Sequence, residues 1–171
     1  MTDNKLPCLD LLEVTPDILR GLMTELTEED KRWKPAPDRY SIAEVLAHLS
    51  HCEGDLYRVR LDRFMAESRP EFKPDNAQNY FDLYRNADPQ KAFEHFEEQR
   101  ENNIQFLRKL PASAGERLAL HYQNGEITLS HLLNEMALHD LGHIRQIAEL
   151  VRARKYKASA GPMAVSYNLK P

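Results

Sequence analysis

The sequence is poor in the residue types that build specialised architectures. Glycine occurs only 6 times and cysteine only twice in 171 residues. The low glycine content excludes collagen-like and low-complexity proteins, and two cysteines cannot form the disulfide framework of a small secreted protein. Hydrophobic residues make up 42% of the chain. We therefore predict one ordinary folded domain over residues 1–171, with residues 154–171 as a C-terminal tail.

Long apolar segments are also missing. No stretch of about 18 consecutive apolar residues occurs, so we expect no membrane-spanning helix. The first residues lack the charged-then-apolar pattern of a signal peptide. A cytoplasmic location is the resulting expectation.

An excess of positive charge is the third absence. Lysine and arginine number 23 against 27 aspartates and glutamates, which gives a net charge of −4. General nucleic-acid binding is therefore disfavoured, because the phosphate backbone attracts basic surfaces. A small molecule is the expected partner.

Helix caps and hydrophobic spacing predict an all-α protein, a four-helix bundle. The first helix is predicted to start at Thr15 as the cap, with Pro16 as its first residue. The second starts with the capping box of Ser41 and Glu44. The predicted helices cover Thr15–Leu26, the residues from Ser41 to just before Pro70, Asp88–Leu110, and the residues from Thr128 to Val151.

The segments between these helices carry weaker signals. Glu71–Ala87 is predicted as a long ordered crossover, because it contains the aromatic residues Tyr80, Phe81 and Tyr84, which are unusual in flexible linkers. Arg117–Glu126 alternates in hydrophobicity and includes Asn124-Gly125, which is typical of a short hairpin or an extended lead-in to the last helix.

A polar run interrupts the third predicted helix at Glu97–Asn103. Our main interpretation is a solvated helix face. The alternative is that Gln99 or Asn103 faces a polar site inside the bundle.

Two histidines on the last predicted helix provide the clearest chemical signal. His139 and His143 are four residues apart, so both rings lie on one face of a helix and can reach one metal ion. The H-E-x-x-H motif of metalloproteases is absent, because Asp140 stands where that motif has glutamate.

A third ligand must come from another helix, since catalytic zinc commonly has three protein ligands and an open position. His48 is the favoured candidate over His51, because Leu46 and Leu49 place His48 on the apolar face. Cys52 could ligate through sulfur, but a buried or free cysteine is the favoured interpretation.

Two further residues on the last helix could support these ligands. Glu135 precedes His139 by one turn and is either an acceptor for its second ring nitrogen or a surface residue. Gln146 could form a hydrogen bond within the bundle. We expect the remaining histidines to be solvated: His95, His121 and His131.

Taken in order, these motifs resemble a known family. Tyr40-Ser41-Ile42-Ala43-Glu44-Val45-Leu46-Ala47-His48-Leu49 and the later His139-x-x-x-His143-x-x-Gln146-Ile147 resemble the DinB/YfiT-like metalloenzyme superfamily, over about Thr15 to Ala153. The resemblance implies a four-helix bundle with a long crossover connection and a divalent metal held by His48, His139 and His143. Tyr40 stands where the family most often has tryptophan, a difference that affects packing more than chemistry.

The resemblance implies a site more firmly than a reaction. Family activities include thiol S-transfer, isomerisation of maleylpyruvate and metal-dependent hydrolysis. We expect an S-transferase that uses a low-molecular-weight thiol such as bacillithiol or mycothiol, or a hydrolase, with Zn²⁺ or Ni²⁺ because imidazole nitrogen suits these ions better than Mg²⁺ or Ca²⁺. A homodimer is implied by the resemblance alone. The alternative is a non-catalytic metal-binding or stress-response module, which a fourth ligand from His51 or Cys52 would favour.

Overall fold

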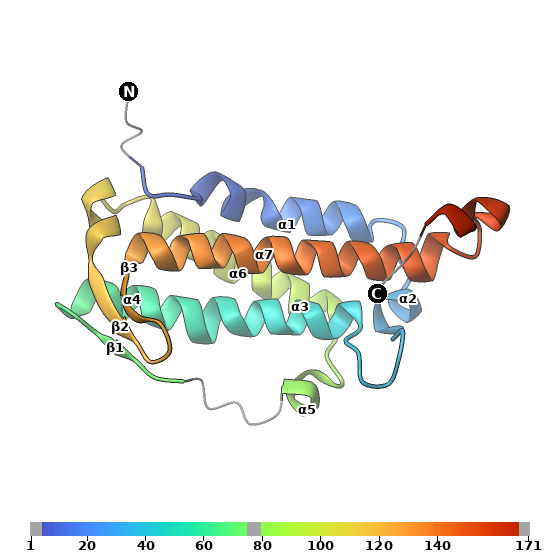
Figure 1. Ribbon diagram of the computed structural model, residues 1–171, viewed down its shortest axis with the longest axis horizontal. Coiled ribbons are helices and arrows are strands. Elements are labelled where there is room, and N and C mark those ends of the chain that lie inside the picture. Colours follow the sequence, from blue (N-terminus) through green and yellow to red (C-terminus); the bar gives the residue numbers. More distant parts are fainter. Residues whose placement is uncertain (1–4, 75–79, 168–171) are drawn as a thin grey trace.

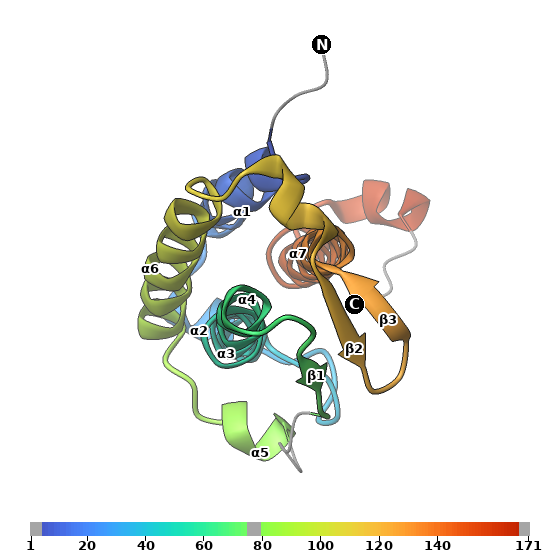
Figure 2. The ribbon, with the colours of Figure 1, turned by 90° about the vertical axis from the view of Figure 1, so that its left-hand side faces the viewer.

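Four long helical rods lie side by side along the longest axis of the molecule (Figure 1). The computed structural model describes residues 5–74 and 80–167. Seen from one end, the rods surround a common interior (Figure 2). The rods are α1 (Leu9–Met23), the series α3 (Ile42–His51), η1 (Cys52–Arg58) and α4 (Val59–Ala66), then α6 (Pro89–Leu107) and α7 (Leu129–Val151). The predicted four-helix bundle is confirmed.

The second rod begins at the predicted cap but is not one regular α-helix. The Ser41 hydroxyl accepts a hydrogen bond from the backbone N–H of Glu44, and the Glu44 side chain accepts one from the backbone N–H of Ser41. Between α3 and α4, η1 is a π-helical segment. Such wider turns occur often at functional sites, and the sequence did not predict this one.

The first helix starts earlier than predicted. α1 begins at Leu9, so Thr15 is not its cap and Pro16 lies inside it. Proline has no N–H to donate to the carbonyl oxygen four residues back, which here belongs to Leu12. The side chain of Arg100 donates to that oxygen instead, at 2.7 Å. The tertiary structure thus satisfies the carbonyl group that Pro16 leaves free.

The other two rods begin where predicted. Asp88 caps α6 by accepting from the Lys91 N–H, and α6 ends at Leu107, three residues before the predicted end. Thr128 caps α7 in a capping box with His131. These caps set the starts of two of the rods.

A small sheet lies at the end of the bundle where α7 begins (Figure 1), and the sequence predicted only part of it. β2 (Leu118–His121) and β3 (Gly125–Thr128) form an antiparallel hairpin, the first of the two predicted alternatives for this segment. Gly125 has a φ of 69°, which glycine adopts without strain. β1 (Glu71–Phe72), from the crossover, pairs in parallel with β2.

The remaining segments connect the rods or follow the last one. The crossover contains β1 and α5 (Tyr80–Tyr84), and its residues 75–79 lie outside the described residues. Short helical segments occur at α2 (Glu28–Arg32), η2 (Ala112–Glu116), η3 (Arg152–Tyr156) and η4 (Gly161–Ser166). Arg154 pairs with Glu29 at 2.9 Å and with Asp30 at 2.8 Å, so the start of the predicted tail contacts the bundle. Among the described residues, no helix is long and apolar enough to cross a membrane.

The apolar core is divided into two clusters by a layer of buried polar residues. One cluster lies toward the hairpin end of the bundle and includes Leu12, Phe64 and Leu133. The other lies toward the opposite end and includes Leu19, Leu49 and Ile147. Each rod contributes at least one buried polar residue to the layer between them: Thr15, Glu53, Arg100, Asn103 and Asp140.

Two of these residues correct the interpretation of the polar run in α6. Arg100 and Asn103 are each 2% exposed, so the run Glu97–Asn103 is not simply a solvated face. The alternative interpretation is correct for Asn103, which faces an internal polar site.

Candidate metal centre

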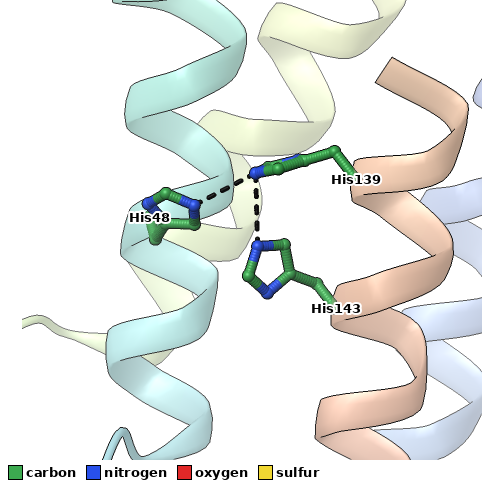
Figure 3. A group of neighbouring side chains, drawn as sticks. All are labelled: His48, His139 and His143. Atoms are coloured by element: carbon green, nitrogen blue, oxygen red, sulfur yellow. Dashed lines mark hydrogen bonds between the residues drawn. The ribbon is translucent and has the colours of Figure 1, made fainter. Parts of the chain in front are cut away.

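Three half-buried histidines from two neighbouring rods meet between those rods (Figure 3). His48 comes from α3, and His139 and His143 come from consecutive turns of α7. One nitrogen atom of each ring lies within 4.8 Å of the corresponding atoms of the other two. The structure therefore brings together the three residues that the sequence selected. We call them the histidine cluster.

The nitrogen spacing suits a metal ion. The Nε2 atom of His139 lies 3.0 Å from Nε2 of His48 and 3.2 Å from Nε2 of His143. An ion about 2.0–2.1 Å from each nitrogen, the usual zinc–histidine distance, places neighbouring nitrogens about 2.9–3.4 Å apart for bond angles of about 90–110°. The three residues could therefore hold one divalent ion without rearrangement of the helices.

Burial keeps the cluster in the form that a metal requires. Burial, followed by the nearby His143 and His51, lowers the pKa of His48 to about 4. Burial, followed by the neighbouring histidines and Arg100, lowers the pKa of His139 to about 3. Burial also lowers the pKa of His143, against the opposing effect of its hydrogen bond to Gln146. All three rings are neutral at pH 7, and neutral imidazole is the ligand form.

The Nδ1 atoms of the three rings, which face away from the proposed ion, differ in their hydrogen-bond partners. Nδ1 of His143 donates to Oε1 of Gln146 at 2.9 Å, which leaves the lone pair of its Nε2 facing His139. The predicted bundle hydrogen bond of Gln146 is thus present. Nδ1 of His48 lies 3.5 Å from the hydroxyl of Tyr84. Nδ1 of His139 is buried and has no hydrogen-bond partner among the described residues.

Of the two interpretations of Glu135, the surface residue agrees with the structure, because Glu135 is exposed on α7. Oε1 of Glu135 accepts a hydrogen bond from the hydroxyl of Tyr57 at 3.1 Å. Tyr57 itself packs edge-on against the His139 ring, with 5.7 Å between the ring centroids. Desolvation raises the pKa of the Glu135 carboxyl. Tyr57 connects this carboxyl to the His139 ring.

The alternative ligands do not join the cluster. Nδ1 of His51 lies 3.4 Å from a carboxylate oxygen of Asp55, on the same rod. The Cys52 sulfur is buried and lies 3.6 Å from Nε2 of His48, but within residues 5–74 and 80–167 the group of mutually close ligand atoms comprises the three histidines alone. No fourth protein ligand is therefore placed among the described residues.

We did not predict the buried charges that lie next to the cluster. Arg100 forms ion pairs with Glu53 at 2.9 Å and with Asp140 at 2.6 Å, and all three side chains are at most 2% exposed. A signal was present, because Arg100 and Asn103 continue the three-and-four spacing of the core residues of α6: Phe93, Phe96 and Leu107. In α6, the position of a residue on the core-facing side of the helix therefore predicts its burial better than its polar type does.

Comparison with known proteins supports the architecture. YfiT from Bacillus subtilis, described as a probable metal-dependent hydrolase with an unusual four-helix bundle topology, superposes with a TM-score of 0.75 and 23% sequence identity. The match covers 85% of this chain and 84% of YfiT. No curated protein matches the sequence. At this identity the likeness to YfiT establishes the fold. Residues 11–147, most of the bundle, match the DinB superfamily, and the chain therefore belongs to that superfamily.

Proposed function

We propose that this protein is a metal-dependent hydrolase of small molecules, in which His48, His139 and His143 hold a divalent ion. The observation that carries the proposal is the convergence of the three Nε2 atoms from α3 and α7, at 3.0 and 3.2 Å from the central one. Membership of the DinB superfamily and a fold shared with YfiT, a probable metal-dependent hydrolase, support it.

Zn²⁺ or Ni²⁺ is the proposed ion. Three neutral imidazoles are a nitrogen donor set, which these ions accept, whereas Mg²⁺ and Ca²⁺ prefer oxygen ligands. When bound, such an ion lowers the pKa of a water molecule and so supplies a nucleophile near neutral pH.

The residues around the cluster have separate tasks in this proposal. Gln146 holds the tautomer of His143 in which Nε2 is free to ligate. Glu135 is the proposed proton acceptor, because it accepts from the hydroxyl of Tyr57, whose ring packs against His139, and because desolvation raises the pKa of its carboxyl. A carboxylate with a raised pKa is a stronger base, which suits general-base catalysis near neutral pH.

Thiol S-transfer is the second candidate function. The number of histidine ligands is as compatible with this reaction as with hydrolysis. With three protein donors in the cluster, the remaining positions of the ion can take a thiolate as readily as water. A low-molecular-weight thiol would then be the cosubstrate. The non-catalytic alternative is less well supported, because structural zinc usually has four protein ligands. The cytoplasmic location and the homodimer stay predictions.

Elemental analysis of the untagged protein tests the metal site. We expect about one Zn²⁺ or Ni²⁺ per chain, lost in His48→Ala and in His143→Ala and kept in His51→Ala, the matched control one turn after His48. No metal in the wild-type protein after reloading would contradict the proposal.

Two assays of the loaded protein then separate the reactions. Metal-dependent cleavage of a panel of activated esters and amides, lost in Glu135→Gln while the metal is retained, would support the hydrolase. Acceleration of thiol conjugation to monochlorobimane, with no hydrolysis, would favour the transferase instead.

A further inference from the structure

Arg100 lies at the centre of the bundle and uses every N–H group of its guanidinium. Nε and Nη2 donate to the two carboxylate oxygens of Glu53, both at 2.9 Å. Nη1 and Nη2 donate to the two carboxylate oxygens of Asp140, at 2.6 and 3.0 Å. Nη1 also donates to the carbonyl oxygen of Leu12 at 2.7 Å. A guanidinium has five N–H donors, and all of them have acceptors here.

The two carboxylates are held by other partners as well. The Asn103 amide donates to Oε1 of Glu53 at 2.9 Å. The Thr15 hydroxyl donates to Oδ2 of Asp140 at 2.8 Å. We call these five residues, Thr15, Glu53, Arg100, Asn103 and Asp140, the arginine network. Its members come from α1, η1, α6 and α7, so one set of hydrogen bonds joins all four rods.

The network is attached to the same segments as the histidine cluster. Asp140 directly follows His139 on α7, and Glu53 follows His48 by five residues in the continuous rod of α3 and η1. Arg100 belongs to neither rod and forms a paired contact with each carboxylate. Such paired contacts fix orientation as well as distance. A single side chain of α6 therefore bridges α7 and the rod that carries His48.

Stability alone does not account for this arrangement. A buried ion pair contributes little net stability compared with well-packed apolar side chains of similar volume, and its best-attested advantage is a defined register. Two carboxylates and one guanidinium also leave a net charge of −1 inside the bundle. That charge lies beside a cluster of neutral rings.

We propose that Arg100 is a positioning residue for the metal centre, which holds His48 of α3 against the two histidines of α7 at ligand spacing. This inference rests on the proposed function and adds to it a residue that touches neither metal nor substrate. The network fixes the two rods, and the fixed rods bring the Nε2 atoms of His48 and His139 to 3.0 Å.

The test removes the network without leaving a charge unpaired. In the triple variant Glu53→Gln, Arg100→Met, Asp140→Asn, all three charges are replaced by neutral side chains of similar size. We expect a folded protein whose affinity for Co²⁺ and Zn²⁺, measured by competition with a chromophoric chelator, is about 10–100-fold lower than that of the wild type. The visible absorption of bound Co²⁺ should change too, because it reports ligand geometry.

Glu44→Gln is the matched control. Glu44 is a buried carboxylate on α3, one turn before His48, and it pairs with Lys34 at 2.8 Å without any contact to the arginine network. Its replacement should leave metal affinity and the Co²⁺ spectrum unchanged. Equal losses in the control and the triple variant would overturn the inference, since loosening of α3 would then explain both.

Two milder variants keep the inference testable if the triple variant does not fold. Thr15→Val removes one hydrogen bond from Asp140, and Asn103→Leu removes the amide that holds Glu53, while Arg100 and its ion pairs remain. Each should weaken metal binding in the same direction by a smaller factor. Unchanged affinity in both, or in a folded triple variant, would overturn the positioning role. A wild-type protein that binds neither ion would overturn the proposed function instead, so the two failures are distinguishable.

Discussion

The arginine network and the histidine cluster both join α7 to the rod of α3 and η1, but within residues 5–74 and 80–167 only the network matches each N–H group of its central side chain with an acceptor. Every N–H group of Arg100 has an acceptor at 3.0 Å or less. In the cluster, Nε2 of His139 faces two other nitrogen atoms at 3.0 and 3.2 Å. A single proton on that atom can point at one of them only.

The difference indicates what each group is for. Donors and acceptors that match one another need no further partner, and they hold the structure in place. The nitrogen atoms of the half-buried histidine cluster converge without such a match, which is the arrangement proposed above to hold a cation. The following experiments contrast the two groups, beginning with the largest expected effect.

Replacing His139 should abolish stoichiometric metal binding, because its Nε2 lies between those of His48 and His143. We expect His139→Ala to retain less than about a tenth of the wild-type metal content by elemental analysis, since a missing ligand exceeds the tenfold loss typical of a missing supporting contact. His51→Ala should keep the full content. Equal metal content in His139→Ala and the wild type would show that the cluster does not hold the ion.

Replacing Arg100 should have the largest effect on the stability of the metal-free protein. Arg100→Ala leaves Glu53 and Asp140 as unpaired buried charges, and we expect a loss of about 3–5 kcal/mol in the free energy of unfolding. His139→Ala, measured with chelator in the same urea titration, should lose much less, because its Nδ1 has no partner among the described residues. Similar losses in both variants would remove the distinction between the two groups.

Gln146 offers a smaller change within the cluster. Gln146→Leu removes the acceptor for Nδ1 of His143, which frees the ring to adopt the wrong tautomer. Metal affinity should fall by about 10–100-fold, or about 1.4–2.8 kcal/mol. Gln105→Leu, at an exposed position of α6, is the control and should bind as the wild type does. Unchanged affinity in Gln146→Leu would mean that the tautomer is set by another contact.

The last contrast is a pH dependence of the metal-free protein. The pKa of His139 falls from 6.5 in the unfolded chain to about 3 in the folded protein, so between these values the unfolded chain binds more protons. This contribution to stability is present above pH 6.5 and is lost as the pH falls toward about 3. Urea titrations from pH 7.5 to about 4 should therefore show a shallower decline for His139→Ala than for the wild type. Parallel declines would contradict the lowered pKa.

Local signals in the sequence predicted the bundle and the histidine cluster well. Ser41, Asp88 and Thr128 cap their helices as expected, since a capping side chain bonds to backbone groups within three residues. The four-residue spacing of His139 and His143 is likewise a local property of one helix. His48 could be selected because its apolar neighbours Leu46 and Leu49 indicate which face of α3 is buried.

Contacts between distant segments account for what the sequence did not predict. Thr15 and Pro16 have the residue types of a helix start, but α1 continues through them, and Arg100 binds the Leu12 carbonyl group that Pro16 leaves without a donor. Glu135 precedes His139 by the expected four residues, yet its carboxylate is taken by Tyr57 from another rod. The prediction of one domain over the whole chain stays a prediction.

Because Arg100 donates to the carbonyl oxygen of Leu12, the effect of a substitution at Arg100 depends on the residue at position 16. A chain that lost Arg100 would bury an unsatisfied carbonyl group in α1, since Pro16 supplies no N–H to it. Replacing Pro16 by alanine would restore that donor from within the helix. In urea titrations, Pro16→Ala should accordingly restore the part of the stability of an Arg100 variant that is lost at the Leu12 carbonyl group, even though the two positions are far apart in the sequence.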